Sequence, residues 1–167
     1  MPPAVASCYT PGMSITIRPA TLADIPEILR QRRAMYEDMQ YDDASALAEM
    51  TRLTNEYLQR AITDGSFRPW LAFDAAHPVA GGAVLISPGP AHPYDLECRR
   101  ARILNVYTNR DYRRRGIARQ LMQTMIASCK DQGFARVTLH ASDDGRRLYE
   151  SLGFEASNEM KLILRES

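Results

Sequence analysis

Alternating apolar and polar residues near the start of the chain are followed by two stretches of helical spacing. Residues 14–18 alternate, which predicts a strand that buries Ile15 and Ile17. From 24 to 39 and from 47 to 62 apolar residues recur every three or four positions, which predicts two amphipathic helices. Gly65 follows the second stretch, as is common where helices end.

The rest of the chain predicts a hairpin and then an alternation of strands and helices. Two apolar runs joined by a short turn predict the hairpin, and the Pro- and Gly-rich segment after it predicts an exposed loop. The chain therefore reads as a mixed α/β domain. The predicted strands are 67–73, 79–86, 102–108, 136–140 and 159–164, the loop is 87–93, and the helices are 117–133 and 145–152.

Length and composition limit the class of protein. With 167 residues, 45% apolar and 25% charged, the chain suits one globular domain, and no apolar run approaches the roughly 20 residues that span a bilayer. Residues 1–12 lack a basic start followed by an apolar stretch, so they do not resemble a secretory signal. We expect a flexible leader over 1–12, a single domain over 13–167 and no membrane partner.

The cysteines bear on metal binding and on location. Cys8, Cys98 and Cys129 are odd in number and far apart, with no Cys-x-x-Cys spacing and no nearby pair of histidines. We therefore expect no metal site, and the reducing cytoplasm as the location.

Charge is balanced overall but unevenly distributed. Lys and Arg number 21 against 20 for Asp and Glu, so the net charge of +1 gives no reason to expect nucleic acid as a partner. Between Arg99 and Arg119, however, eight arginines accompany the single acid Asp111, a local charge of +7. This region predicts a site for an anion.

The segment Arg113-Arg114-Arg115-Gly116-Ile117-Ala118 lies where a predicted strand turns into a helix. Such a turn exposes backbone N–H groups at the positive end of the helix dipole, and the arginines add charge, so the segment predicts a phosphate site. It has neither the Gly-Lys-Ser/Thr of a P-loop nor Gly-x-Gly-x-x-Gly. An arginine-rich solvated turn is the alternative reading of the same residues.

The pattern Arg113-x-x-Gly116-x-Ala118 resembles the pyrophosphate-binding segment of the GCN5-related N-acetyltransferase family. Strand residues Val106, Tyr107 and Thr108 and the segment 148–154, Leu-Tyr-Glu-Ser-Leu-Gly-Phe, also resemble that family. The resemblance implies acetyl-coenzyme A as cosubstrate and a mostly antiparallel sheet in which two parallel strands splay apart. Backbone groups of 106–108, near a bulge, would hold the pantetheine arm, and Arg114, Arg115 and Ile117 would complete the phosphate site.

The resemblance also implies a catalytic acid. Tyr149 would protonate the departing thiolate, since the reference pKa of a phenol is near 10; packing in an amphipathic helix is its alternative role. Ser142 stands where the family often has an Asn that touches pantetheine. For the general base, the sequence leaves four candidates open, which are Glu37, Glu97, Tyr107 and His140.

The acceptor is expected to be a primary amine, small or peptidic, whose nitrogen attacks the acetyl thioester directly in a ternary complex. Residues 34–51 carry five acids and no Lys or Arg, which favours an acceptor with an additional positive charge, although solvent-facing acids are an equal reading. A non-catalytic acyl-coenzyme A sensor is the alternative function, and nucleic-acid binding through the arginines is the weaker one. The sequence leaves open whether the chain forms a homodimer.

Overall fold

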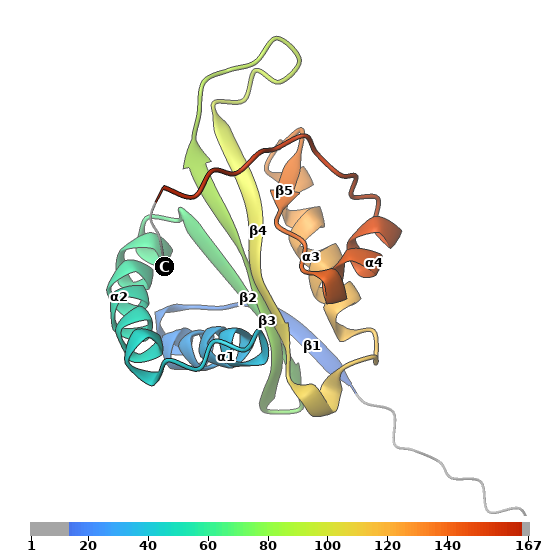
Figure 1. Ribbon diagram of the computed structural model, residues 1–167. Coiled ribbons are helices and arrows are strands. Elements are labelled where there is room, and N and C mark those ends of the chain that lie inside the picture. Colours follow the sequence, from blue (N-terminus) through green and yellow to red (C-terminus); the bar gives the residue numbers. More distant parts are fainter. Residues whose placement is uncertain (1–13, 165–167) are drawn as a thin grey trace, which may run out of the picture.

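A computed structural model of the protein describes residues 14–164, in which five strands form one sheet in the order β1-β2-β3-β4-β5 (Figure 1). Neighbouring strands are antiparallel except β4 and β5, which are parallel. The expected leader lies outside the described residues. The strands are β1 (Ile15–Pro19), β2 (Phe67–Asp74), β3 (His77–Pro88), β4 (Arg99–Thr108) and β5 (Val137–Leu139), and the helices are α1 (Ile25–Asp38), α2 (Ala44–Thr63), α3 (Ile117–Asp131) and α4 (Asp143–Ser151).

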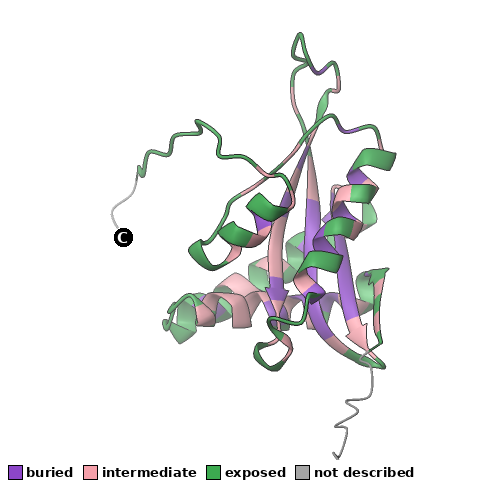
Figure 2. Cartoon of the chain, turned by 90° about the vertical axis from the view of Figure 1, so that its right-hand side faces the viewer, coloured by how far each residue is buried: buried purple, intermediate pink, exposed green. Residues whose placement is uncertain are grey.

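Helices cover both faces of the sheet and bury a separate apolar cluster on each. α1 and α2 lie on one face and share a cluster that includes Leu58 and Leu71, whereas α3 and α4 lie on the other and share a cluster that includes Trp70, Leu121 and Tyr149 (Figures 1 and 2). The predicted amphipathic helices bury their apolar faces in this way. The expected mixed, mostly antiparallel sheet with a parallel pair is therefore confirmed.

Short polar contacts fix where the helices begin. The Asp43 side chain accepts a hydrogen bond of 3.0 Å from the Ala46 amide at the start of α2. Before α1, the Asp24 carboxylate accepts a hydrogen bond of 2.8 Å from the Thr21 amide. It also forms an ion pair of 2.9 Å with Arg18 at the end of β1. These contacts tie the first strand to the first helix.

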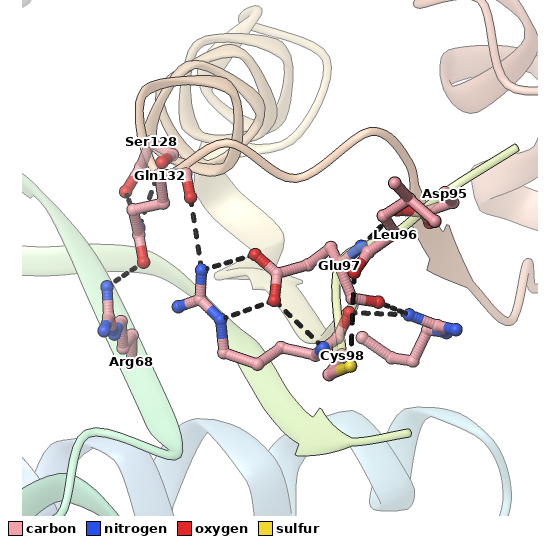
Figure 3. A network of polar contacts seen from close by, with 9 residues as sticks. Arg68, Asp95, Leu96, Glu97, Cys98, Ser128 and Gln132 are labelled. Carbon is pink, nitrogen blue, oxygen red and sulfur yellow. Dashed lines mark hydrogen bonds and ion pairs between the residues drawn. The ribbon is translucent and has the colours of Figure 1, made fainter. Parts of the chain in front are cut away.

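A polar network holds the C-terminal end of α3 (Figure 3). Arg68 of β2 donates to the Gln132 side chain, which donates in turn to the Ser128 hydroxyl at 3.0 Å. Arg99 donates to the Gln132 carbonyl at 3.3 Å and lies 4.7 Å over the ring of Phe134. The network fixes this end of α3 against the start of β4.

The prediction of a final strand over 159–164 is wrong. Residues 155–164 have no regular secondary structure, and the side chains of Met160, Leu162, Ile163 and Leu164 are 72–95% exposed (Figure 2). Their alternation favours an extended backbone, but a strand also needs a hydrogen-bonded neighbour. The three-residue β5 is the last strand of the sheet among the described residues, and it offers only a short edge.

Candidate functional site

β4 and β5 separate beside an irregularity in β4. The parallel pairing covers only residues 101–103 and 137–139, and β4 then continues to Thr108 without β5. On its other side β4 pairs Leu104 with Ala83 and Tyr107 with Gly81, so that two residues, Asn105 and Val106, lie opposite Gly82 alone. This is a β-bulge, located where the two parallel strands part.

Asn105 is the extra residue of the bulge, and it has φ +56°, in the left-handed region. Asn adopts this conformation more readily than most residues do. Its side-chain oxygen accepts a hydrogen bond from Arg32 of α1, so the Asn105 side chain lies on the α1 side of the sheet. Because the bulge takes up one extra residue, Ile103 and Val106 both pack on the α3 side, which simple alternation would not allow.

The loop between β4 and α3 forms an open anion cradle, defined here as residues 113–118. Gly116, the residue before α3, has φ +79°, and Arg114 has φ +61°. The first turn of α3 presents backbone N–H groups that have no acceptor within the helix. A Cβ added to Gly116 would meet no atom within 4 Å, so no side chain of the described residues fills the space beside its Cα. Both properties fit a phosphate group.

The arginines of the cradle differ in how they are held. Arg113 donates to the Thr108 carbonyl at 2.9 Å and pairs with Asp38 at the end of α1, where Arg110 also pairs. Although burial raises it, the pKa of Asp38 lies below its ordinary value because both guanidinium groups donate to the carboxylate. Arg114 has no polar partner among residues 14–164, and Arg115 stacks 5.3 Å from the ring of Tyr112. Arg114 therefore has a guanidinium available to an anion.

The eight arginines of the basic region do not form one patch. Arg99 and Arg100 begin β4, where Arg99 pairs at 2.8 Å with Glu97. A strand of ten residues places them about 30 Å from its other end, at about 3.3 Å per residue. The positive charge beside the cradle thus comes from the arginines at 110–119.

Tyr149 has its ring in the core and its hydroxyl free. The residue is 9% exposed, and its ring lies 6.1 Å from that of Phe154. Within the described chain the hydroxyl has no hydrogen-bond partner, and burial raises the pKa of Tyr149. Tyr149 is therefore protonated at neutral pH and able to donate. A Cβ on Gly145 would lie 2.7 Å from the ring, so Gly145 makes room for it.

The other predicted site residues lie on β4 and at the starts of α3 and α4. Val106 packs on the α3 side, whereas Tyr107 is buried with Arg113 lying 5.5 Å over its ring. The Ser142 hydroxyl caps α4, because it accepts a hydrogen bond of 3.3 Å from the Gly145 amide. This capping role was not predicted from the sequence. Ile117, the first residue of α3, is buried, and Ala118 follows it on the first turn.

Three of the four candidates for the general base have other partners. Glu97 lies near the C-terminal end of α3 (Figure 3), and hydrogen bonds from Arg99 lower its pKa. Glu37 pairs with Arg33 at 2.8 Å. His140 follows β5 and lies 3.6 Å from Glu159 on the surface. Within residues 14–164 none of these three makes a polar contact with the bulge, whereas Tyr107 lies two residues beyond Asn105 on the same strand.

The described residues contain neither a metal-binding cluster nor a membrane-spanning helix. The described residues hold no cluster of three or more His, Cys, Asp or Glu that could bind a metal ion. No helix in residues 14–164 is both long and apolar enough to cross a membrane.

Comparison with known proteins identifies the family. Residues 35–162 match the acetyltransferase (GNAT) domain, and the chain belongs to this family. Human N-acetyltransferase 8 is 26% identical over 123 residues, which are 72% of this chain and 51% of that protein. An uncharacterised N-acetyltransferase, YsnE of Bacillus subtilis (strain 168), is 30% identical over 66 residues, 36% of this chain and 44% of that protein. The chain thus spans about half the length of these curated relatives.

Solved structures agree with this assignment. A GCN5-related N-acetyltransferase from Ralstonia eutropha JMP134 superposes with a TM-score of 0.83 and 31% identity, over 90% of this chain and 99% of that one. A predicted acetyltransferase of Clostridium acetobutylicum, solved with acetyl-CoA, gives a TM-score of 0.79 at 22% identity, over 90% and 96% of the two chains. The expected family and enzyme class are confirmed.

Proposed function

We propose that the protein transfers the acetyl group of acetyl-coenzyme A to a primary amine by direct attack in a ternary complex. The observation that carries this proposal is the bulge at Asn105, located where β4 and β5 part and within three residues of the end of the strand that leads to the cradle. A ligand with phosphates at one end and a thioester at the other would fit these two features. The Clostridium acetobutylicum relative was solved with acetyl-CoA, which supports the choice of cosubstrate.

Each part of the cosubstrate has a proposed partner. The N–H groups of Gly116, Ile117 and Ala118 and the side chains of Arg114 and Arg115 would bind the pyrophosphate. Backbone groups of Val106, Tyr107 and Thr108 would pair with the pantetheine arm, with Ser142 close to it. Arg113 would join the phosphate site only by exchanging its contact with Asp38 for one with phosphate.

The chemistry requires one proton to be supplied and one removed. The amine nitrogen attacks the thioester carbon, the carbon–sulfur bond breaks, and the thiolate takes a proton from the Tyr149 hydroxyl. The nitrogen loses its proton to water, from which Tyr149 is then reprotonated. A backbone N–H at the bulge would donate to the carbonyl oxygen as negative charge develops there. The raised pKa and the unpartnered hydroxyl of Tyr149 support its role as the acid.

Assay of thiol release separates this function from that of an acyl-coenzyme A sensor. Purified protein is incubated with acetyl-coenzyme A and a panel of primary amines, and free coenzyme A is measured. We expect turnover with at least one class of amine, which Tyr149→Phe slows. A protein whose melting temperature rises with coenzyme A, but which releases no thiol with any amine, would be the sensor.

An additional positive charge on the acceptor stays a prediction, and the structure weakens its basis. Four of the five acids between residues 34 and 51 are engaged: Glu37 with Arg33, Asp38 with Arg110 and Arg113, Asp43 with the start of α2, and Glu49 with Arg52. In the described chain Asp42 alone of the five has no polar partner. The Michaelis constants of a dicationic and a monocationic amine, compared between the parent and Asp42→Asn, test this preference.

We also propose that the protein forms a homodimer through its C-terminal segment. The support is the exposure of four apolar side chains in residues 160–164. Exposed apolar groups of this kind favour association. Light scattering should give twice the mass of one chain, and replacement of Leu162 and Ile163 by Lys should return the protein to one chain.

The cytoplasm is the location that we propose. Cys98 and Cys129 are both free thiols, Cys98 on the surface and Cys129 in the core, which suits a reducing compartment. Fractionation of cells that produce the protein tests this proposal.

A further inference from the structure

Arg32 differs from the two other arginines of α1 because it has no acidic partner. Arg30 pairs with Glu27 at 2.7 Å, and Arg33 pairs with Glu37 at 2.8 Å. No carboxylate among residues 14–164 lies within 4 Å of the Arg32 guanidinium. Since a guanidinium stays protonated in proteins, its charge has no compensating anion here.

Within residues 14–164 the polar and ring contacts of the Arg32 guanidinium are with neutral groups. One Nη donates to the Asn105 side chain, the other lies 3.4 Å from the Tyr36 hydroxyl, and the guanidinium lies 5.1 Å from the centre of the Tyr36 ring. The Nε atom is buried without a hydrogen-bond partner, and no other side-chain nitrogen or oxygen of the described residues is in that state. A partly buried guanidinium charge is costly without a compensating anion, and an anion at its Nη groups would lower that cost.

The place of Arg32 indicates which molecule would carry the anion. Its partner Asn105 forms the bulge, beside which the thioester would lie in the proposed function. The phosphates of the cosubstrate would bind at the cradle, beyond Thr108 and about 10 Å along β4, and the cradle has arginines of its own. An anion at Arg32 would therefore belong to the acceptor.

We propose that Arg32 binds a carboxylate or phosphate group that the acceptor carries near its amine. This inference rests on the proposed acetyl transfer and deepens it, because it names the chemical class of the acceptor. The planar guanidinium fork suits both groups, which it can bind through two parallel hydrogen bonds. The Nη groups make this contact, since Nε is closed to solvent. Arg32 also anchors Asn105, so one side chain would hold the acceptor next to the bulge.

The test compares amines that differ only in the anion. Michaelis constants and kcat are measured for α-amino acids against their α-amides, which tests carboxylate, and for phosphoethanolamine against ethanolamine, which tests phosphate. The variants are Arg32→Gln, Arg32→Lys and the control Arg33→Gln, which removes a neighbouring arginine that already has a carboxylate. Melting temperatures show that each variant is folded.

In the parent and in Arg33→Gln, kcat/KM should be higher for one of the anionic amines than for its neutral counterpart. Arg32→Gln should remove this preference, with a loss of about 10- to 100-fold for the anionic amine and little change for the neutral one, as for a hydrogen bond to a charged group. Arg32→Lys should be intermediate. Equal use of anionic and neutral amines by the parent would overturn the proposal. An equal loss for both kinds in Arg32→Gln would overturn it too, because Arg32 would then only anchor Asn105.

A binding measurement separates this proposal from the proposed function. The N-acetylated forms of the same amino acids and amides are titrated against the protein with coenzyme A present. The acids should bind the parent more tightly than the amides, and Arg32→Gln should remove the difference. If no amine is acetylated, the proposed transfer fails, and these titrations still decide whether Arg32 binds an anion.

Discussion

Replacement of Gly116 by Glu tests the cradle most directly. At φ +79° any residue other than Gly is strained, by about 1–2 kcal/mol. A Cβ there meets no atom within 4 Å, so we expect no further loss of stability from crowding at the Cβ. The carboxylate would instead enter the space proposed for the pyrophosphate and repel it.

Gly133, just after the other end of α3, provides a matched control. It has φ +82°, and a Cβ there also meets nothing within 4 Å. Gly133→Glu should therefore lose at least as much free energy of unfolding as Gly116→Glu does, because a carboxylate is unfavourable at the C-terminal end of a helix and favourable at its N-terminal end. The two variants differ in where the new carboxylate lies, which is the variable of interest.

Thermal unfolding with and without coenzyme A measures the difference. At a concentration about 100 times its dissociation constant, coenzyme A should stabilise the parent by about 2.7 kcal/mol, or roughly 5–10 °C in Tm for a chain of this size. Gly133→Glu should keep this rise at a lower starting Tm, and Gly116→Glu should lose it. If both variants respond as the parent does, the phosphates bind elsewhere and the reasoning is refuted.

Three further predictions concern single side chains. Tyr149→Phe should keep the coenzyme A shift in Tm but slow turnover by about 10- to 10³-fold, because only the proton donor is lost; an unchanged rate would leave Tyr149 a packing role. Glu97→Gln should leave turnover unchanged in the thiol-release assay, since Glu97 pairs with Arg99 far from the bulge; a large loss would reinstate it as a base. The hydrogen bond from Arg18 lowers the pKa of Asp24 to about 2, below its ordinary 3.8, so this carboxylate stabilises the fold above about pH 4 and loses that effect toward pH 2. In urea unfolding at pH 7, Asp24→Asn should lower the free energy of unfolding by about 1 kcal/mol, a modest value because Arg18 is half exposed and solvent screens the pair. The difference from the parent should vanish toward pH 2.

Local patterns predicted most of the elements, because helices and hairpins follow from spacing over a few residues. The failure over 159–164 has a different origin, since a strand depends on a partner elsewhere in the chain as well as on its own alternation. For the same reason the sequence could not show that Arg113 pairs with Asp38, 75 positions away. From the sequence alone the acids of residues 34–51 counted as unpaired negative charges, whereas most of them have partners in the structure.

The cradle was predictable because its chemistry is contiguous, with six consecutive residues that hold the turn, the glycine and the arginines. Arg32 and Asn105 were missed because neither belongs to a motif. One signal was present: a polar Asn, which tolerates φ above zero, interrupts the apolar run from Ile103 to Val106. An alternation pattern that assumes a regular strand does not detect a bulge at this Asn.

The bulge in β4 amounts to a one-residue insertion that the hydrophobic core does not require. Without Asn105, Ala101, Ile103 and Val106 would still follow one another on the α3 side by ordinary alternation, and Leu104 and Tyr107 on the other. Deletion of Asn105 should therefore yield a chain that still folds, with β4 regular along its whole length and paired throughout with β3. That chain should retain the cradle and its response to coenzyme A while losing turnover, which would separate the residues that build the domain from the one that interrupts it.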